Sequence, residues 1–126
     1  MINNEQIMAD YLYGLPQQFK DCLQMEFDFN GKYQRSYDHI LICGMGGSAI
    51  GGDILRTWGQ IEAAKPLIVN RDYQIPNFVN ENSLVIAVSY SGNTEETLQA
   101  YHSARDRGAS LICVTSGGRL ADLARK

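Results

Sequence analysis

From residue 39 onward the sequence repeats one pattern, in which a short apolar run is followed by a longer polar or amphipathic segment. The four runs are "HILICG" (39–44), "PLIVN" (66–70), "SLVIAVS" (83–89) and "SLICVTS" (110–116). They are nearly continuous in Leu, Ile, Val and Cys rather than alternating with polar residues, which is typical of strands buried on both faces of a sheet. The pattern therefore predicts four parallel strands.

The segments between these runs predict how the strands are connected. Residues 48–63, "SAIGGDILRTWGQIEA", and 94–108, "TEETLQAYHSARDRG", are expected to form crossover helices, the second closed by Gly108. Residues 71–82 contain Pro76 and several Asn and predict a loop with at most a single turn. The last segment, "GGRLADLARK", begins a further helix. This alternation favours a three-layer α/β/α fold with a flavodoxin-like parallel sheet of strand order 2-1-3-4, whose fifth strand is missing.

The first 35 residues have a different, helical pattern. "NNEQIMADYLY" has apolar residues at helical spacing, and Gly14 is expected to end this helix. Pro16 suits the first position of a second helix, whose apolar stripe is Leu15, Phe19, Cys22, Leu23 and residues 25–27. We expect one domain over residues 1–126, with N-terminal helices in 1–35 and an α/β core in 36–126.

Composition excludes several functional classes. The chain has 126 residues and a formal charge of -3, without the Lys/Arg stripe typical of nucleic-acid binding. Its apolar runs are far shorter than the roughly 20 residues that span a bilayer, and its N-terminus does not resemble a signal peptide, so we expect a cytoplasmic protein without membrane contact. Cys22, Cys43 and Cys113 have no metal-ligand spacing and are expected to be reduced thiols, so no metal site is predicted.

The loop after the third apolar run, "SYSGNTEET" (89–97), is unusually rich in hydroxyl groups. Ser89, Ser91 and Thr94 precede a helix whose first backbone N–H groups lack acceptors, and such a helix start favours an anion. Gly92 would let the backbone approach a ligand closely. The alternative is that Asn93 or Thr94 only caps the helix, with Glu96 completing a capping box. Glu95 and Glu96 are expected to point outward.

The loop after the first run, "GMGGSAIGGD" (44–53), is rich in glycine. Gly44, Gly46 and Gly47 are expected before the helix, Gly51 and Gly52 inside it, and Ser48 at the turn, where it could cap the helix or bind an anion. In the predicted strand order this loop faces the loop after the third run, where ligands of open α/β sheets bind. Gly44, Gly46 and Ala49, followed by Asp72, also match a weak dinucleotide fingerprint. A phosphorylated sugar suits the pair of loops better, because a dinucleotide does not need the second hydroxyl-rich loop.

These two motifs together resemble those of the sugar isomerase (SIS) domain, in particular the N-terminal half of the bifunctional phosphoglucose/phosphomannose isomerase family. The resemblance covers roughly residues 36–126. It implies that Ser48, Ser89, Ser91 and Thr94 bind a sugar phosphate, helped by backbone near Gly46, Gly47 and Gly92. It also implies interconversion of glucose 6-phosphate or mannose 6-phosphate with fructose 6-phosphate, without a metal or nucleotide cofactor.

The resemblance leaves the catalytic base unassigned. In that family the catalytic Glu, His and Lys lie beyond the point where this sequence ends, and His39 and His102 are expected to be structural. We therefore expect a fragment of a longer protein with two SIS domains, inactive by itself and homodimeric. The alternatives are a non-catalytic SIS-type sugar-phosphate sensor and, third, a dinucleotide-binding module.

Overall fold

The computed structural model describes residues 3–27 and 31–126, and the chain divides into two compact units, Met1–Gln34 and Arg35–Lys126. In its described residues the first unit contains one helix, and the second unit contains the sheet and the remaining helices. No helix in the described parts of the chain is long and apolar enough to cross a membrane.

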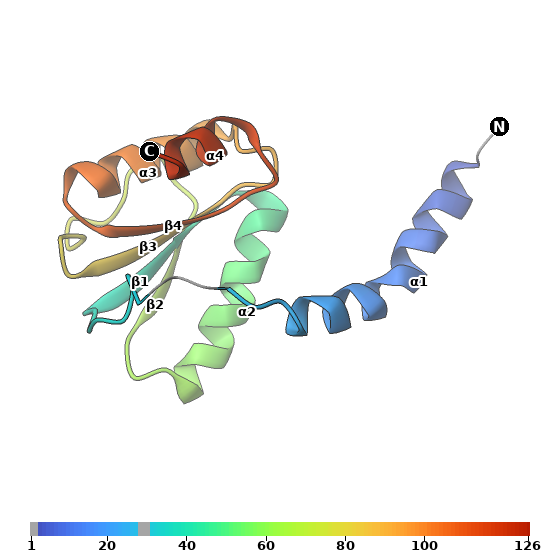
Figure 1. Cartoon of the computed structure of the whole chain (residues 1–126), viewed down its shortest axis with the longest axis horizontal. Coiled ribbons are helices and arrows are strands. Elements are labelled where there is room, and N and C mark those ends of the chain that lie inside the picture. Colours follow the sequence, from blue (N-terminus) through green and yellow to red (C-terminus); the bar gives the residue numbers. More distant parts are fainter. Residues whose placement is uncertain (1–2, 28–30) are drawn as a thin grey trace. The chain divides into compact units, whose positions relative to one another are not determined.

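The first unit corrects the expectation of two N-terminal helices. A single helix, α1 (Asn4–Leu23), begins at Asn3, whose side chain accepts a hydrogen bond from the Glu5 N–H at 3.1 Å, and it includes Pro16. Residues 25–27 follow its end and do not extend a helical stripe. Gly14 and Pro16 weaken a helix without always ending it: Pro16 removes one hydrogen bond, to the carbonyl of Leu12. The ribbon of α1 changes direction partway along (Figure 1), as expected for a helix with an internal proline.

The second unit confirms the predicted sheet. Its four strands lie in the order β2-β1-β3-β4, and all neighbouring pairs are parallel. The strands are β1 (His39–Cys43), β2 (Leu67–Asn70), β3 (Ser83–Val88) and β4 (Ser110–Val114), within one or two residues of the predicted runs. The carboxyl ends of all four strands therefore lie at one edge, and the loops that follow β1 and β3 are neighbours there.

Helices cover the two faces of this sheet, which gives the expected three layers (Figure 1). On one face α2 (Gly46–Glu62) packs on β1 and β2. On the other face α3 (Glu95–Asp106) and α4 (Gly118–Ala124) pack on β1, β3 and β4. Successive residues of β1 divide between the faces: Leu41 joins the core on the α3 side, whereas Ile42 lies beside Gly52 of α2.

The connections also follow the sequence signals. Residues 71–82, between β2 and β3, contain no helix or strand, as predicted. Helix α3 is followed, after its cap residue Arg107, by Gly108, which has a φ of 76°. The N–H of Gly108 donates to the carbonyl of Arg105 at 2.9 Å, and the N–H of Ala109 donates to that of Ala104 at 3.1 Å. This pair of bonds is the glycine-terminated arrangement that the sequence predicts for the end of this helix.

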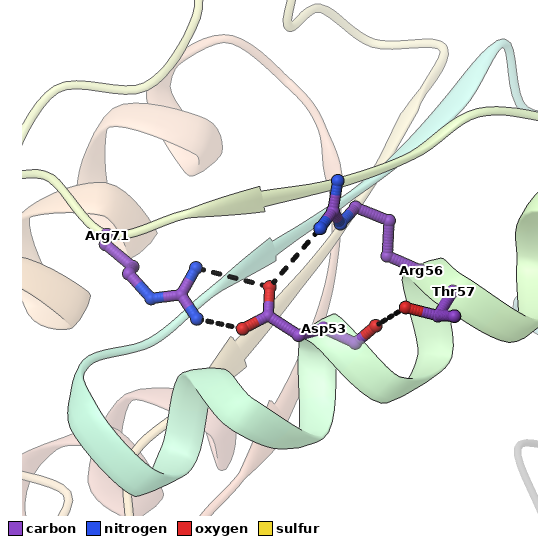
Figure 2. A network of polar contacts seen from close by, with 4 residues as sticks. All are labelled: Asp53, Arg56, Thr57 and Arg71. Carbon is purple, nitrogen blue, oxygen red and sulfur yellow. Dashed lines mark hydrogen bonds and ion pairs between the residues drawn. The ribbon is translucent and has the colours of Figure 1, made fainter.

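Helix α2 is joined to the end of β2 by charged groups as well as by packing. The Asp53 carboxylate accepts hydrogen bonds from both terminal nitrogens of Arg71, and Arg56 lies 4.0 Å from the same carboxylate (Figure 2). The hydrogen bonds from Arg71, followed by the positive charges of Arg71 and Arg56, hold the Asp53 pKa below its ordinary value. Because the network is at the surface, it fixes geometry more than it contributes free energy.

Candidate functional site

The loop between β3 and α3 brings three of the predicted site residues into direct contact. Ser89 Oγ and Thr94 Oγ1 lie 2.8 Å apart, and the Gly92 N–H donates to Ser89 Oγ at 3.1 Å. One hydroxyl hydrogen lies between the Ser and Thr oxygens, so the other is left to donate to a ligand. Ser91 is exposed; its Oγ accepts from the Asn93 N–H at 3.2 Å, which leaves its own hydrogen free.

The start of α3 has no side-chain cap. Thr94 occupies the N-cap position, but no side chain there accepts a hydrogen bond from the helix backbone. The alternative in which Asn93 or Thr94 only caps the helix is therefore not what the structure contains. The N–H groups of the first turn remain without helical acceptors, and together with the helix dipole they favour a negatively charged group.

The first turn of α4, which follows β4, holds the β3–α3 loop in place. The Leu120 N–H donates to the Gly92 carbonyl at 2.9 Å, and the Arg119 N–H donates to Asn93 Oδ1 at 3.2 Å. Gly92 and Gly118 both have positive φ, 67° and 68°. A Cβ on Gly92 would overlap the Gly117 carbonyl oxygen, and a Cβ on Gly118 would overlap the Ser91 carbonyl oxygen. Only glycine fits at these two positions.

The turn between β1 and α2 differs in detail from the expectation. Gly46 and Gly47 lie inside α2 rather than before it, and Ser48 is the third residue of the helix, not its cap. Met45 is the N-cap and makes no side-chain cap bond, so this second helix start is also uncapped. A Cβ on Gly44 would lie 3.1 Å from the Val88 carbonyl oxygen, because the ends of β1 and β3 approach closely here.

An open cavity of about 690 Å³ lies at this edge of the sheet and joins the loops after β1, β3 and β4. Its volume is in the range of small-molecule sites. The residues that line it are Met45, Gly47, Ser48, Val88, Tyr90, Val114, Thr115 and Ser116. None of these lining residues has a carboxylate, imidazole or ammonium group, so the cavity is neutral and rich in hydroxyl groups.

The structure divides the predicted site residues into two sets. Tyr90 links them, because it lies between Ser89 and Ser91 in the sequence and lines the cavity together with Gly47 and Ser48. Ser89 is hydrogen-bonded to both Gly92 and Thr94, and Ser91 lies in the same loop, whereas Gly47 and Ser48 line the cavity that Tyr90 also lines. Gly46 is exposed and is not among the lining residues. Sequence analysis missed Tyr90, Thr115 and Ser116. Thr115 and Ser116 directly follow a parallel strand, so they could have been found from the rule that ligands bind at the carboxyl ends of parallel strands.

Charged groups stand beside the α3 start. The pKa of the Tyr73 hydroxyl is raised, mainly by the negative charge of Glu96 and to a smaller extent by that of Glu95. Both carboxylates therefore lie near the loop after β2.

Cys43, at the end of β1, is buried, and burial raises the pKa of its thiol to about 12. Among the described residues, no three His, Cys, Asp or Glu side chains cluster closely enough to hold a metal ion.

The two histidines lie away from the cavity. His39 begins β1, at the opposite end of the strands; its Nε2 is 2.8 Å from Ser83 Oγ and its ring packs edge-on against Phe78. Ser83 is fully buried, and its Oγ also accepts a hydrogen bond from the Asn80 N–H. His102 is the eighth residue of α3, about 12 Å along the axis from the helix start, with its ring against Tyr101. Neither histidine therefore lies beside the residues that line the cavity.

Comparison with known proteins gives concordant matches in sequence and structure. The SIS domain family matches residues 34–125. A bifunctional phosphoglucose/phosphomannose isomerase from Caldicellulosiruptor bescii is 45% identical over 121 residues, which cover 94% of this chain and 35% of the relative. The chain spans about a third of the length of such curated relatives.

Two solved structures share the fold. A proposed phosphosugar isomerase from Salmonella typhimurium is 26% identical with a TM-score of 0.63, covering 74% of this chain and 30% of that one. The NanR protein of Vibrio vulnificus, solved with ManNAc-6P, is 26% identical with a TM-score of 0.55 and covers 70% of this chain and 36% of its own.

Proposed function

Because the chain belongs to the SIS domain family, we propose that it binds the phosphate group of a phosphorylated sugar at the carboxyl edge of its sheet. The observation that carries the proposal is the uncapped start of α3, where Ser89 and Thr94 form a hydroxyl pair beside the exposed Ser91. A phosphate dianion needs several short donors that converge without a competing acceptor. The free hydroxyl hydrogens and first-turn amides supply them.

The two sets of residues then have different roles. We propose that Ser89, Ser91 and Thr94, with the backbone at Gly92, hold the phosphate. Ser48 and the backbone at Gly46 and Gly47, at the uncapped start of α2, would bind it from the opposite side, with the sugar in the cavity against Tyr90 and Thr115. Neutral hydroxyl and amide donors can hold a phosphate dianion, because a hydrogen bond to a charged acceptor is stronger than one between two neutral groups.

For the whole protein we propose an aldose–ketose isomerase that interconverts glucose 6-phosphate or mannose 6-phosphate with fructose 6-phosphate. The identity with the Caldicellulosiruptor bescii enzyme supports this assignment. Isomerisation of this kind needs a base that moves a proton between C1 and C2. No residue lining the cavity can serve as that base. We therefore propose that this chain by itself binds the substrate and does not turn it over.

A second candidate function is a sugar-phosphate sensor. It is favoured by the similarity to NanR, which was solved with a bound sugar phosphate. Both functions require the same phosphate site, so binding does not separate them. The two functions are separated by a coupled assay of the full-length protein that follows conversion of glucose 6-phosphate to fructose 6-phosphate. Turnover assigns the isomerase, and binding without turnover assigns the sensor.

The proposed ligand class is tested by thermal unfolding of the chain with fructose 6-phosphate, mannose 6-phosphate, inorganic phosphate and NAD. We expect both sugar phosphates to raise the unfolding midpoint, with about 2.7 kcal/mol of stabilisation at roughly 100 times the dissociation constant. Unphosphorylated fructose is the matched control and should have no effect. Stabilisation by NAD with no response to sugar phosphates would instead assign the dinucleotide-binding module.

The proposed phosphate contacts are tested with Ser91→Ala and Thr94→Val. Each removes one hydroxyl donor, and we expect affinity for fructose 6-phosphate to fall roughly 10- to 100-fold, the loss of one hydrogen bond to a charged group. Thr57→Val is the control, because Thr57 lies on the exposed surface of α2 and its hydroxyl donates to the Asp53 carbonyl. Unchanged affinity in both site variants would limit Ser91 and Thr94 to forming the turn.

Two further properties of the whole protein belong to this proposal. We propose that it acts in the cytoplasm, since its relatives are named as isomerases of sugar phosphates. We also propose that it is a homodimer, which is tested by its sedimentation velocity at several protein concentrations.

A further inference from the structure

Three successive carbonyl groups of the β3–α3 loop, those of Tyr90, Ser91 and Gly92, all accept hydrogen bonds. The residues that donate to them are, in the same order, Ser116, Asn93 and Leu120. The N–H groups of Tyr90 and Ser91, by contrast, make no hydrogen bond with any residue that the structure describes. The acceptors of this part of the loop are therefore engaged, whereas two of its backbone donors are free.

Ser116, the second residue after β4, uses both of its donors on the Tyr90 carbonyl. Its Oγ lies 2.5 Å from that oxygen, and its backbone nitrogen lies 3.2 Å from it. A serine hydroxyl has a single hydrogen, so an Oγ that donates to Tyr90 does not donate to a ligand at the same time. Ser116 lines the cavity but offers it only oxygen lone pairs, which do not attract an anion. Its hydroxyl therefore differs from that of Ser91, whose hydrogen is free.

Ser116 is itself fixed by its two neighbours in the sequence. Thr115 Oγ1 donates a hydrogen bond to the Gly117 carbonyl at 2.8 Å and accepts one from the Gly117 N–H at 3.2 Å. These two bonds close a turn around Ser116. The position of the Ser116 donors is therefore set by the fold.

The peptide group between Tyr90 and Ser91 connects this contact to the candidate phosphate site. A trans peptide is planar, with its C=O and N–H pointing in opposite directions, and the described residues contain no cis peptide bond. Because Ser116 holds the Tyr90 carbonyl, the Ser91 N–H points away from Ser116. Rotation of this peptide would replace the N–H by a carbonyl oxygen, whose partial negative charge repels an anion.

We propose that Ser116 is a positioning residue for phosphate binding: it holds the Tyr90–Ser91 peptide in the orientation that presents the Ser91 N–H to the phosphate group. It acts through the β3–α3 loop and not by contact with the ligand. The inference rests on the proposed function, because it requires the phosphate group to lie at the start of α3. It adds that a residue following the neighbouring strand, β4, controls how tightly the phosphate is held.

The role of the hydroxyl is tested with Ser116→Ala. This variant leaves the backbone N–H of residue 116 as the only donor from this position to the Tyr90 carbonyl, at a distance near the long end of the hydrogen-bond range. The peptide is then held less firmly without being released. We expect the affinity for inorganic phosphate, measured by isothermal titration calorimetry, to fall roughly 3- to 10-fold, part of the effect of losing one hydrogen bond to a charged group.

Two matched variants identify the hydroxyl as the cause. Ser116→Thr keeps a hydroxyl at the same position, and we expect it to retain most of the affinity of the unmodified chain. Ser110→Ala makes the same chemical change at the amino end of β4, away from the cavity, and should leave phosphate binding unchanged. A threonine variant as weak as the alanine variant would overturn the inference, as would an equal loss in Ser110→Ala.

A second ligand separates positioning from direct contact, because Ser116 lines the cavity in which we place the sugar. A positioning residue acts on the phosphate alone, so Ser116→Ala should weaken inorganic phosphate and fructose 6-phosphate by the same factor. A loss confined to fructose 6-phosphate would mean that Ser116 contacts the sugar, and the positioning role would be wrong.

The amide proton of Ser91 reports the orientation of the peptide directly in ¹H–¹⁵N NMR spectra. In the unmodified chain we expect saturating inorganic phosphate to move this resonance downfield, because the N–H then donates to a charged acceptor. In Ser116→Ala the shift at saturation should be smaller, an effect that a change in stability alone does not produce. Equal shifts and equal affinities in the two proteins would overturn the inference while leaving the phosphate site in place. Absence of phosphate binding by the unmodified chain would instead refute the proposed function, and this inference with it.

Discussion

Single glycines determine whether the two loops at the carboxyl edge can pack against each other. Gly92 has a positive φ, and a Cβ there would overlap the Gly117 carbonyl oxygen. Gly117, two loops away in sequence, has a φ of 165°, which any residue adopts, and a Cβ there would meet no atom within 4 Å. Neighbouring glycines in one contact therefore have very different tolerance to substitution.

We predict that Gly92→Ala lowers the free energy of unfolding by about 2 kcal/mol or more, because the left-handed backbone alone costs about 1–2 kcal/mol for alanine. Gly117→Ala is the matched control and should change it by less than about 0.5 kcal/mol. Urea unfolding of the three proteins measures both effects. Similar losses in the two variants would show that the loops tolerate rearrangement.

Cys43 gives a prediction about pH. Its thiol pKa is raised to about 12 in the folded chain by burial, against an ordinary value of 9.0. Below pH 9 the thiol is protonated in both states and its contribution is fully present. Above pH 9 the unfolded chain releases the proton first, so stability falls until the folded pKa is reached.

We therefore expect the free energy of unfolding to fall by about 1 kcal/mol between pH 8 and pH 10 because of Cys43. In Cys43→Ala this part of the decrease should disappear, whatever the variant's stability at pH 8. Urea unfolding of both proteins at the two pH values measures the difference. Parallel pH profiles would mean that Cys43 ionises equally well in the folded chain.

At the scale of elements, local signals predicted most of the second unit but failed in the first. The apolar runs predicted β1 to β4 because a strand buried on both faces leaves a clear pattern, and Gly108 predicted the end of α3. Gly14 and Pro16 carry the same kind of stop signal, yet α1 continues through both. Glycine or proline lowers the stability of a helix, but flanking residues with good helix propensity can compensate for that loss of free energy.

Pro16→Ala is expected to restore the missing hydrogen bond to the Leu12 carbonyl and to remove the clash that bends the helix. We predict up to about 3 kcal/mol of additional stability for α1 and a stronger helical signal in circular dichroism at 25 °C. Gln17→Ala is the control, because it changes an adjacent helical position without affecting a backbone hydrogen bond. An unchanged spectrum in Pro16→Ala would mean that α1 is already fully formed.

The candidate site was predictable to the extent that it depends on strand order. The order 2-1-3-4 placed Ser48 and the loop after β3 at one edge, and the structure has Ser48 and Tyr90 in one cavity. The loop after β4 follows a parallel strand and was therefore also predictable at this edge, but its close contact with the β3–α3 loop depends on Gly92 and Gly118, which no spacing rule encodes. The exact start of α2 was also missed, since glycines are poor indicators of a helix beginning.

At the scale of the second unit, the two faces of the sheet are buried to different extents. Along β3 the residues alternate between buried and half-buried: Val85 is fully buried on the α3 side, whereas Leu84 is half-buried on the other face. Helix α2 covers β1 and β2 on that face. The hydrophobic core of this unit therefore lies mainly between the sheet and α3.

Two leucines on neighbouring strands test this asymmetry. Leu41 in β1 is fully buried in the core on the α3 side, and we predict that Leu41→Ala costs about 2–5 kcal/mol. The same change at Leu84 removes the same atoms from the less covered face and should cost clearly less. Urea unfolding of both variants below about 1 µM keeps association from contributing. A greater loss from Leu84→Ala would mean that the second face is covered as well as the first.

The backbone contacts between the loops after β3 and β4 have a consequence for ligand recognition. Since hydrogen bonds to Gly92 and Asn93 already fix the β3–α3 loop, its donors need not be ordered when an anion arrives. The entropy of ordering these donors is then lost during folding and not when the ligand binds. This favours a preorganised site over binding by induced fit.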